Sequence, residues 1–123
     1  MNTSLAWVMS RDAEVRQVIA LNLCKRGMRC VELTGTGGSA LPPVKPQVMV
    51  LDIDPEIGLD WGTARTLRRM PWLRGVPLIP IAAVMPLAGQ LAALNPVYPV
   101  RKPLAMDELL AKVRESLAEV GPA

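Results

Sequence analysis

Two carboxylates follow the most apolar short run of the chain, where they could carry chemistry. Asp52 and Asp54 come directly after Val48-Met49-Val50-Leu51, a run typical of a strand buried on both faces. Such a strand delivers Asp52 to the carboxyl edge of a sheet, where ligands gather in α/β folds. A carboxylate there can act as a nucleophile, hold a cation or pair with a basic side chain. Asp54 precedes Pro55, and this dipeptide is typical of a turn.

Length and composition limit the classes of protein to consider. The chain has 123 residues, half of them apolar, which suits one hydrophobic core, so we expect a single domain over 1–123. Its net charge of +3 is spread over many sites, which argues against a nucleic-acid partner. Two cysteines and no histidine exclude zinc and Cys-His chemistry. No long apolar run follows a basic start, so we expect a cytoplasmic protein with no membrane partner.

Strand-like and helix-like segments alternate along the sequence. Short apolar runs predict five strands, and helical periodicity predicts a helix after the first, third, fourth and fifth of them. The predicted strands are 5–9, 28–33, 48–51, 76–81 and 97–100, and the predicted helices are 13–26, 60–70, 87–94 and 106–117. This order favours an α/β fold with a parallel sheet and helices on both faces.

The connection between the second and third predicted strands departs from that alternation. A glycine-rich run from Thr34 to Ser39 ends the second predicted strand. Pro42, Pro43 and Pro46 restrict the backbone of the segment that follows. A helix at this place is therefore expected to be short or absent, which would leave part of one sheet face without a covering helix.

Three landmarks in this order resemble the receiver domain of bacterial response regulators. They are Pro46 to Asp52, Val76 to Ile81, and Arg101-Lys102-Pro103-Leu104 before an Asp-Glu-Leu-Leu helix. The resemblance implies a flavodoxin-like (CheY-like) five-stranded parallel sheet. It also implies that Asp52 is the residue that accepts a phosphoryl group from a histidine kinase. Lys102 would be the lysine that pairs with the acceptor, with a cis peptide bond to Pro103.

The positions that hold magnesium in receivers differ in this chain. The family places two acidic residues after the first strand, where Ser10 and Arg11 stand, and Asp12 is placed to cap a helix instead. Because Mg²⁺ requires carboxylate oxygens in octahedral array, we expect no Mg²⁺ binding and no cofactor. Phosphoryl transfer depends on that metal, so its loss should slow the chemistry severely.

The residues that report phosphorylation in receivers also differ. Ala82 takes the place of the switch hydroxyl after the fourth strand, and Pro99 takes the place of the switch aromatic residue. Tyr98 lies one residue early and is expected on the opposite face of the strand.

Basic residues could neutralise Asp52 instead of a metal. Either Arg11 or Lys102 could form an ion pair with its carboxylate, and we hypothesise that Arg11 fills the space of the missing metal. A structural role for Asp52 then competes with a role as a phosphoacceptor.

We therefore predict a stand-alone atypical receiver, or pseudo-receiver, that signals by protein-protein contact and is not an enzyme. The expected partner is a signalling protein such as a histidine kinase or a downstream effector, and a homodimer is an open possibility. A genuine phosphoacceptor that uses Asp52 is the first alternative. A small-ligand-binding domain at the same sheet edge is the second. The spacing of Asp52 and Asp54 also matches phosphatases of the haloacid dehalogenase type, but Pro55-Glu56 stand where that family requires other residues.

Overall fold

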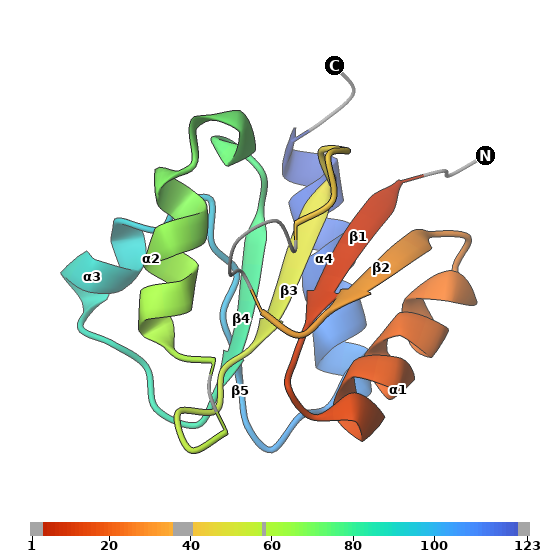
Figure 1. The fold of residues 1–123 in the computed structure, drawn as a ribbon, viewed down its shortest axis with the longest axis horizontal. Coiled ribbons are helices and arrows are strands. Elements are labelled where there is room, and N and C mark those ends of the chain that lie inside the picture. The colour runs from red at the N-terminus through yellow and green to blue at the C-terminus, as the bar shows by residue number, and fades with distance from the viewer. Residues whose placement is uncertain (1–3, 36–40, 58, 121–123) are drawn as a thin grey trace.

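The sheet consists of five parallel strands, as predicted. The computed structural model describes residues 4–35, 41–57 and 59–120, with the side chain of the last residue excluded. The strand order is β2-β1-β3-β4-β5, so β1 and β3 lie at the centre (Figure 1). The strands are β1 (Leu5–Met9), β2 (Arg29–Leu33), β3 (Val48–Asp52), β4 (Leu78–Ala82) and β5 (Val100–Arg101).

Helices cover both faces of this sheet (Figure 1). Buried residues of α1 and α4 pack with one face, whereas those of α2, with its following 3₁₀ turn η2, pack with the other. The ranges are α1 (Ala13–Cys24), α2 (Trp61–Arg69), η2 (Pro71–Leu73), α3 (Ala88–Ala92) and α4 (Met106–Val120).

Alternation along the central strands divides the core into two layers. Trp7 and Met49 point to the α2 side, and Val8 and Val50 point to the α1 and α4 side. All five residues of β1 and all five of β3 are buried, which explains why both read as continuous apolar runs in the sequence. The carboxyl ends of β1 and β3 are therefore fixed by side chains packed on both faces of the sheet.

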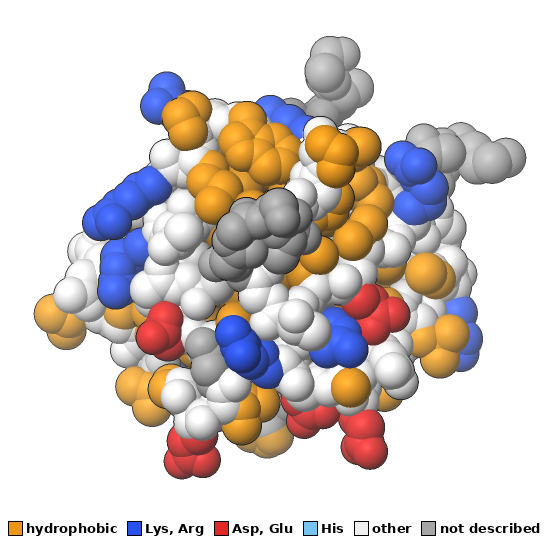
Figure 2. Space-filling view, viewed as in Figure 1, with side chains coloured by type: hydrophobic (Ala, Val, Ile, Leu, Met, Phe, Trp, Pro, Cys, Tyr) orange, Lys and Arg blue, Asp and Glu red, His pale blue; other side chains and the backbone are white. Residues whose placement is uncertain are grey.

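The prediction of a missing second helix agrees with the described part of the chain. None of residues 34–35 and 41–47 is helical, and 36–40 lie outside the described residues. Leu41 instead packs on the α2-side core, and the Trp72 ring meets buried Trp7 edge-on with centroids 5.6 Å apart. Figure 2 shows apolar side chains gathered on this face.

Prolines shorten two strands relative to the prediction. β4 begins at Leu78 instead of Val76, and β5 contains only two residues. Leu78 donates its amide to Pro96 on the β5 side, so the residue two further along, Pro80, presents no donor to that neighbour. The ladder between β4 and β5 is consequently reduced to a bridge at Val97 and two register pairs.

Candidate functional site

The parallel sheet brings four sequence-predicted residues to one edge. Ser10 follows β1, Asp52 ends β3, Ala82 ends β4 and Lys102 follows β5. Backbone hydrogen bonds continue past the strand ends, from the amide of Ser10 to Leu33 O (3.0 Å) and from that of Lys102 to Ala82 O (3.0 Å). The sheet thus fixes the backbone at the positions that face Asp52.

The carboxylate of Asp52 is buried and both of its oxygens have protein partners. Its residue is only 4 % exposed. The Ser10 hydroxyl donates to Oδ2 at 2.7 Å, and the Lys102 ammonium lies 2.9 Å from Oδ1. A buried carboxylate requires compensation of its charge and lone pairs, and these two contacts supply it.

Ser10 is itself held in place by the start of α1. It is fully buried, and its Oγ accepts the amide of Asp12 at 3.0 Å. The Asp12 carboxylate then caps α1 by accepting the amides of Glu14 (3.0 Å) and Val15 (3.2 Å), as predicted. The loop after β1 therefore aims a hydroxyl donor, and not a carboxylate, at Asp52.

Lys102 is also preorganised. Its ammonium donates to the carbonyl of Ile53 at 2.9 Å as well as pairing with Asp52, and the Lys102-Pro103 peptide bond is cis, as the resemblance implied. The hypothesis that a basic residue neutralises Asp52 is confirmed for Lys102.

The corresponding hypothesis for Arg11 is wrong. Among the described residues, Arg11 forms no ion pair with Asp52, because its side chain is exposed and its guanidinium lies beside Gly35. The hydroxyl of Ser10 takes the contact with the free oxygen of Asp52 instead. A buried guanidinium would have needed several further acceptors there, whereas one hydroxyl satisfies one oxygen.

This arrangement does not fit a magnesium ion. One oxygen of Asp52 already accepts the hydroxyl of Ser10, and the other forms an ion pair with Lys102. Within residues 4–35, 41–57 and 59–120, no three acidic, cysteine or histidine side chains are grouped so that they could hold a metal. A hard cation would have to displace the ammonium and find further oxygen ligands.

Ala82 and Tyr98 are the residues that the sequence placed at or beside the switch positions of receivers. Ala82 is buried and offers no hydrogen-bonding group beyond its backbone. Tyr98 packs with the α1 and α4 layer, and its hydroxyl donates to Glu119 on α4. That hydrogen bond, together with burial and the nearby negative charge of Glu119 and Glu115, raises the pKa of Tyr98 to about 12. The ring of Tyr98 is therefore held against α4, away from Asp52.

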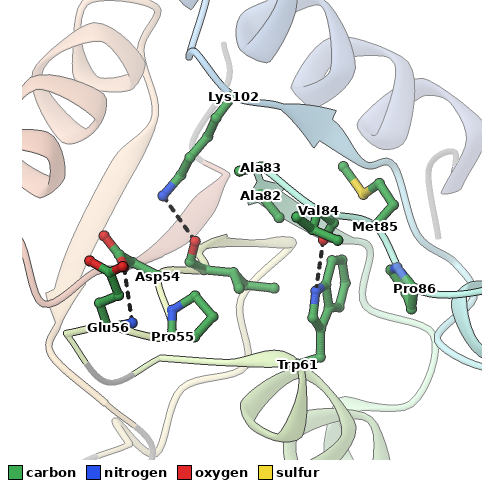
Figure 3. A pocket seen from close by; sticks show the side chains of 11 residues that line it. Asp54, Pro55, Glu56, Trp61, Ala82, Ala83, Val84, Met85, Pro86 and Lys102 are labelled. Atoms are coloured by element: carbon green, nitrogen blue, oxygen red, sulfur yellow. Dashed lines mark hydrogen bonds between the residues drawn. The ribbon is translucent and has the colours of Figure 1, made fainter.

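Asp54 forms a turn, as its sequence context predicted. Its Oδ1 accepts the amide of Glu56 (3.1 Å) and its own amide donates to Leu59 O (2.8 Å). Beside this turn lies a largely apolar cleft of about 590 Å³ that extends from Asp54 and Lys102 to Trp61 and Met85 (Figure 3). Small Ala82 leaves part of that space open.

Two structural features of this region were not predicted. The Trp61 indole donates to Val84 O at 3.1 Å, which ties α2 to the segment after β4 (Figure 3). Arg68 donates to three backbone carbonyls, those of Leu94, Leu73 and Pro96. The contacts of Trp61 with Val84 and of Arg68 with Leu94 and Pro96 join segments far apart in the sequence. The sequence of an arginine-rich helix does not indicate which carbonyls its arginines will bind.

No helix long and apolar enough to cross a membrane is found among the described residues. No protein-family model and no curated protein matches this sequence.

Solved structures do resemble the fold over nearly the whole chain. A response regulator receiver protein from Pseudomonas putida is 25 % identical, with a TM-score of 0.71 over 94 % of this chain and 98 % of that one. A two-component response regulator from Clostridium difficile has a TM-score of 0.78 at 16 % identity, over 98 % and 100 %. The chemotaxis response regulator CheY4 of Vibrio cholerae has 0.77 at 14 %, over 94 % and 100 %. The chain therefore has the fold of response-regulator receiver domains.

Proposed function

We propose that this protein is an atypical receiver domain that acts in two-component signalling through protein-protein contact, without magnesium-dependent phosphorylation of Asp52. The observation that carries this proposal is the occupation of both Asp52 oxygens by Ser10 and Lys102. A phosphoryl acceptor needs an oxygen free to attack and a cation to offset charge on the transferred group. Here the nucleophile is neutralised by the protein itself.

The residues at the switch positions, Ala82 and Tyr98, support the same proposal. A phosphoryl group on Asp52 would find the methyl group of Ala82 where a hydroxyl would be needed to bind it. Tyr98 is held by Glu119, so its ring is not poised to follow such a hydroxyl. The fold could then present a fixed surface to a histidine kinase or a downstream effector, and we place that encounter in the cytoplasm.

A genuine phosphoacceptor is the second candidate, and Lys102 favours it. The ammonium is held 2.9 Å from Asp52, as the resemblance implied for a working receiver. Lysine alone can orient a phosphoryl group, but it leaves the equatorial oxygens short of positive charge without the metal.

Incubation with acetyl phosphate and Mg²⁺ separates the two candidates by intact-mass measurement. We expect no stoichiometric adduct on the parent protein. Asp54→Ala serves as the control for nonspecific modification of a nearby carboxylate. A phosphate adduct that disappears in Asp52→Ala but persists in Asp54→Ala would establish the second candidate and refute the first.

The contact part of the proposal has its own test. Cross-linking in cells should recover the same partners with the parent protein and with Asp52→Asn, because the contact surface does not depend on phosphorylation. Loss of those partners in a folded Asp52→Asn protein would contradict the proposal.

A further inference from the structure

A second cleft, which shares Trp61 and Pro86 with the cleft beside Asp54, lies between α2 and α3. Its volume is about 460 Å³, within the range of small-molecule sites. The apolar part of its wall includes Trp61, Pro86 and Leu94. Figure 1 shows α2 and α3 side by side, and Figure 2 shows blue basic side chains on this flank of the molecule.

The charge of this cleft is entirely positive. Arg65, Arg68 and Arg69 all line it, and no carboxylate does. Among the described residues, none of these guanidiniums forms an ion pair with an acidic side chain. Three guanidiniums without an ion-pair partner around one small volume attract an anion that carries more than one charge.

Part of the cleft is rigid before any ligand arrives. The indole of Trp61 is fixed by its hydrogen bond to Val84 O (3.1 Å). The guanidinium of half-buried Arg68 is fixed by Leu94 O (2.9 Å), Leu73 O (3.3 Å) and Pro96 O (3.1 Å). A fixed aromatic surface and a fixed cation reduce the entropy that a ligand would lose in ordering them.

The other two arginines have the opposite character. Arg65 and Arg69 are exposed and lie four residues apart on α2, one helical turn. Residues at this spacing share a helix face, so both can turn toward one anion. Arginine is suited to this because its planar fork donates two parallel hydrogen bonds to phosphate oxygens.

We propose that this cleft binds a nucleoside polyphosphate, with the phosphates on Arg65 and Arg69 and the base against Trp61. A ring that contacts Trp61 places its phosphates toward the arginines of the same helix. A multiply charged phosphate chain matches several cations better than a single carboxylate does. An acidic peptide would need a longer groove, whereas this cleft has the size of a small molecule.

Calorimetric titration with ADP tests the proposal on the full chain. We expect saturable binding of one ADP, and a dissociation constant that rises by roughly tenfold or more in the double variant Arg65→Ala/Arg69→Ala. Both side chains are exposed, so this variant should keep its fold, which circular dichroism checks. The matched control is Arg26→Ala/Arg29→Ala, which removes the same charge from exposed positions near the end of α1 and the start of β2 and should change the constant by less than about twofold.

Three outcomes would overturn the proposal. The first is the absence of saturable ADP binding, and the second is an equal loss in both double variants, which would indicate a diffuse effect of charge. The third is competition in which pyrophosphate or a hexaglutamate peptide binds as tightly as ADP, because the base would then contribute nothing. None of these outcomes bears on the phosphorylation of Asp52, so the two proposals fail separately.

Discussion

At the residue scale, the central contact is the hydrogen bond from the hydroxyl of Ser10 to the buried carboxylate of Asp52. Ser10 has one hydroxyl proton, and its 2.7 Å contact with Asp52 is shorter than its 3.2 Å contact with Asp12 O, so the carboxylate receives it. Ser10 therefore supplies a hydrogen-bond donor to Asp52 and brings no negative charge of its own.

Replacement of Ser10 by alanine should lower the stability of the protein, although it removes only one oxygen atom. Ser10→Ala leaves one oxygen of a buried carboxylate without its donor, so we expect a loss of about 1–3 kcal/mol in the free energy of unfolding by urea. Ser116→Ala is the matched control, because Ser116 is also fully buried but donates only to Val113 O on its own helix. Equal losses in the two variants would show that the Asp52 contact adds nothing.

Arg11→Asp alone should not create a magnesium site. The new carboxylate would lie at an exposed position, and Asp52 would still be bound by Ser10 and Lys102. Ser10→Asp/Arg11→Asp should bind Mg²⁺ measurably, because a second buried carboxylate beside Asp52 requires a cation. Titration of both variants with Mg²⁺ checks this, and binding by the single variant as tight as by the double would contradict it.

Tyr98 should titrate at unusually high pH. It is the only tyrosine in the chain, so the ultraviolet absorbance of phenolate follows it directly. Its pKa is raised from 10.0 to about 12, so the stability from its neutral form is complete below pH 10.0 and is lost as the pH rises toward about 12. Glu119→Gln should return the midpoint toward 10.0, whereas Glu115→Gln should move it less. An unchanged midpoint in Glu119→Gln would contradict the assigned cause.

At the scale of elements, α2 is held to the sheet by an arginine as well as by its apolar stripe. Ala64 and Leu67 are buried on its inner face, and Asp60 caps its start by accepting the amide of Thr63 at 3.1 Å. Arg68 then joins its last turn to the carbonyls before and after the β4 strand. Burial lowers the pKa of Arg68, yet guanidinium remains charged in proteins.

Arg68→Lys should therefore destabilise the protein although it keeps the charge. A single ammonium cannot reach three carbonyls in different directions, so we expect a loss of about 1–3 kcal/mol by urea unfolding. The neighbouring Arg69→Lys provides the control and should change stability by less than about 0.5 kcal/mol, because Arg69 is exposed. A similar effect in both variants would mean that the three carbonyl contacts carry no stability.

The elements that could be predicted are those whose sequence pattern is compatible with only one local structure. The apolar runs of β1 and β3 and the capped start of α1 at Asp12 could be predicted, as could the turn at Asp54. The length of β5 could not, because it depends on whether Pro80 and Pro99 face each other across two strands. For the site, Lys102 was predicted correctly, but the choice of Ser10 over Arg11 as the partner of Asp52 depends on side-chain directions that the residue types leave open.

At the scale of the whole molecule, stability is unevenly distributed across the sheet. Central β1, β3 and β4 are paired on both sides and buried throughout, whereas β2 lies at one edge with two exposed residues. At the opposite edge, β5 has only two residues in its ladder. The Asp52 site joins these parts, because Ser10 and Asp52 belong to the centre and Lys102 to the weak edge.

Amide hydrogen exchange should report this gradient. We expect the hydrogen-bonded amides of β1 and β3 to exchange only through global unfolding, and those of β2 and β5 to exchange faster through local opening. Exchange measured across a series of low denaturant concentrations distinguishes the two routes, since local opening exposes little surface and depends weakly on denaturant. The Lys102 amide, bound to Ala82 O at 3.0 Å, is the critical probe. If Asp52 anchors the weak edge, Asp52→Asn will accelerate exchange at Lys102 more than at Val50. Equal acceleration at both amides would mean that the ion pair stabilises the molecule only globally.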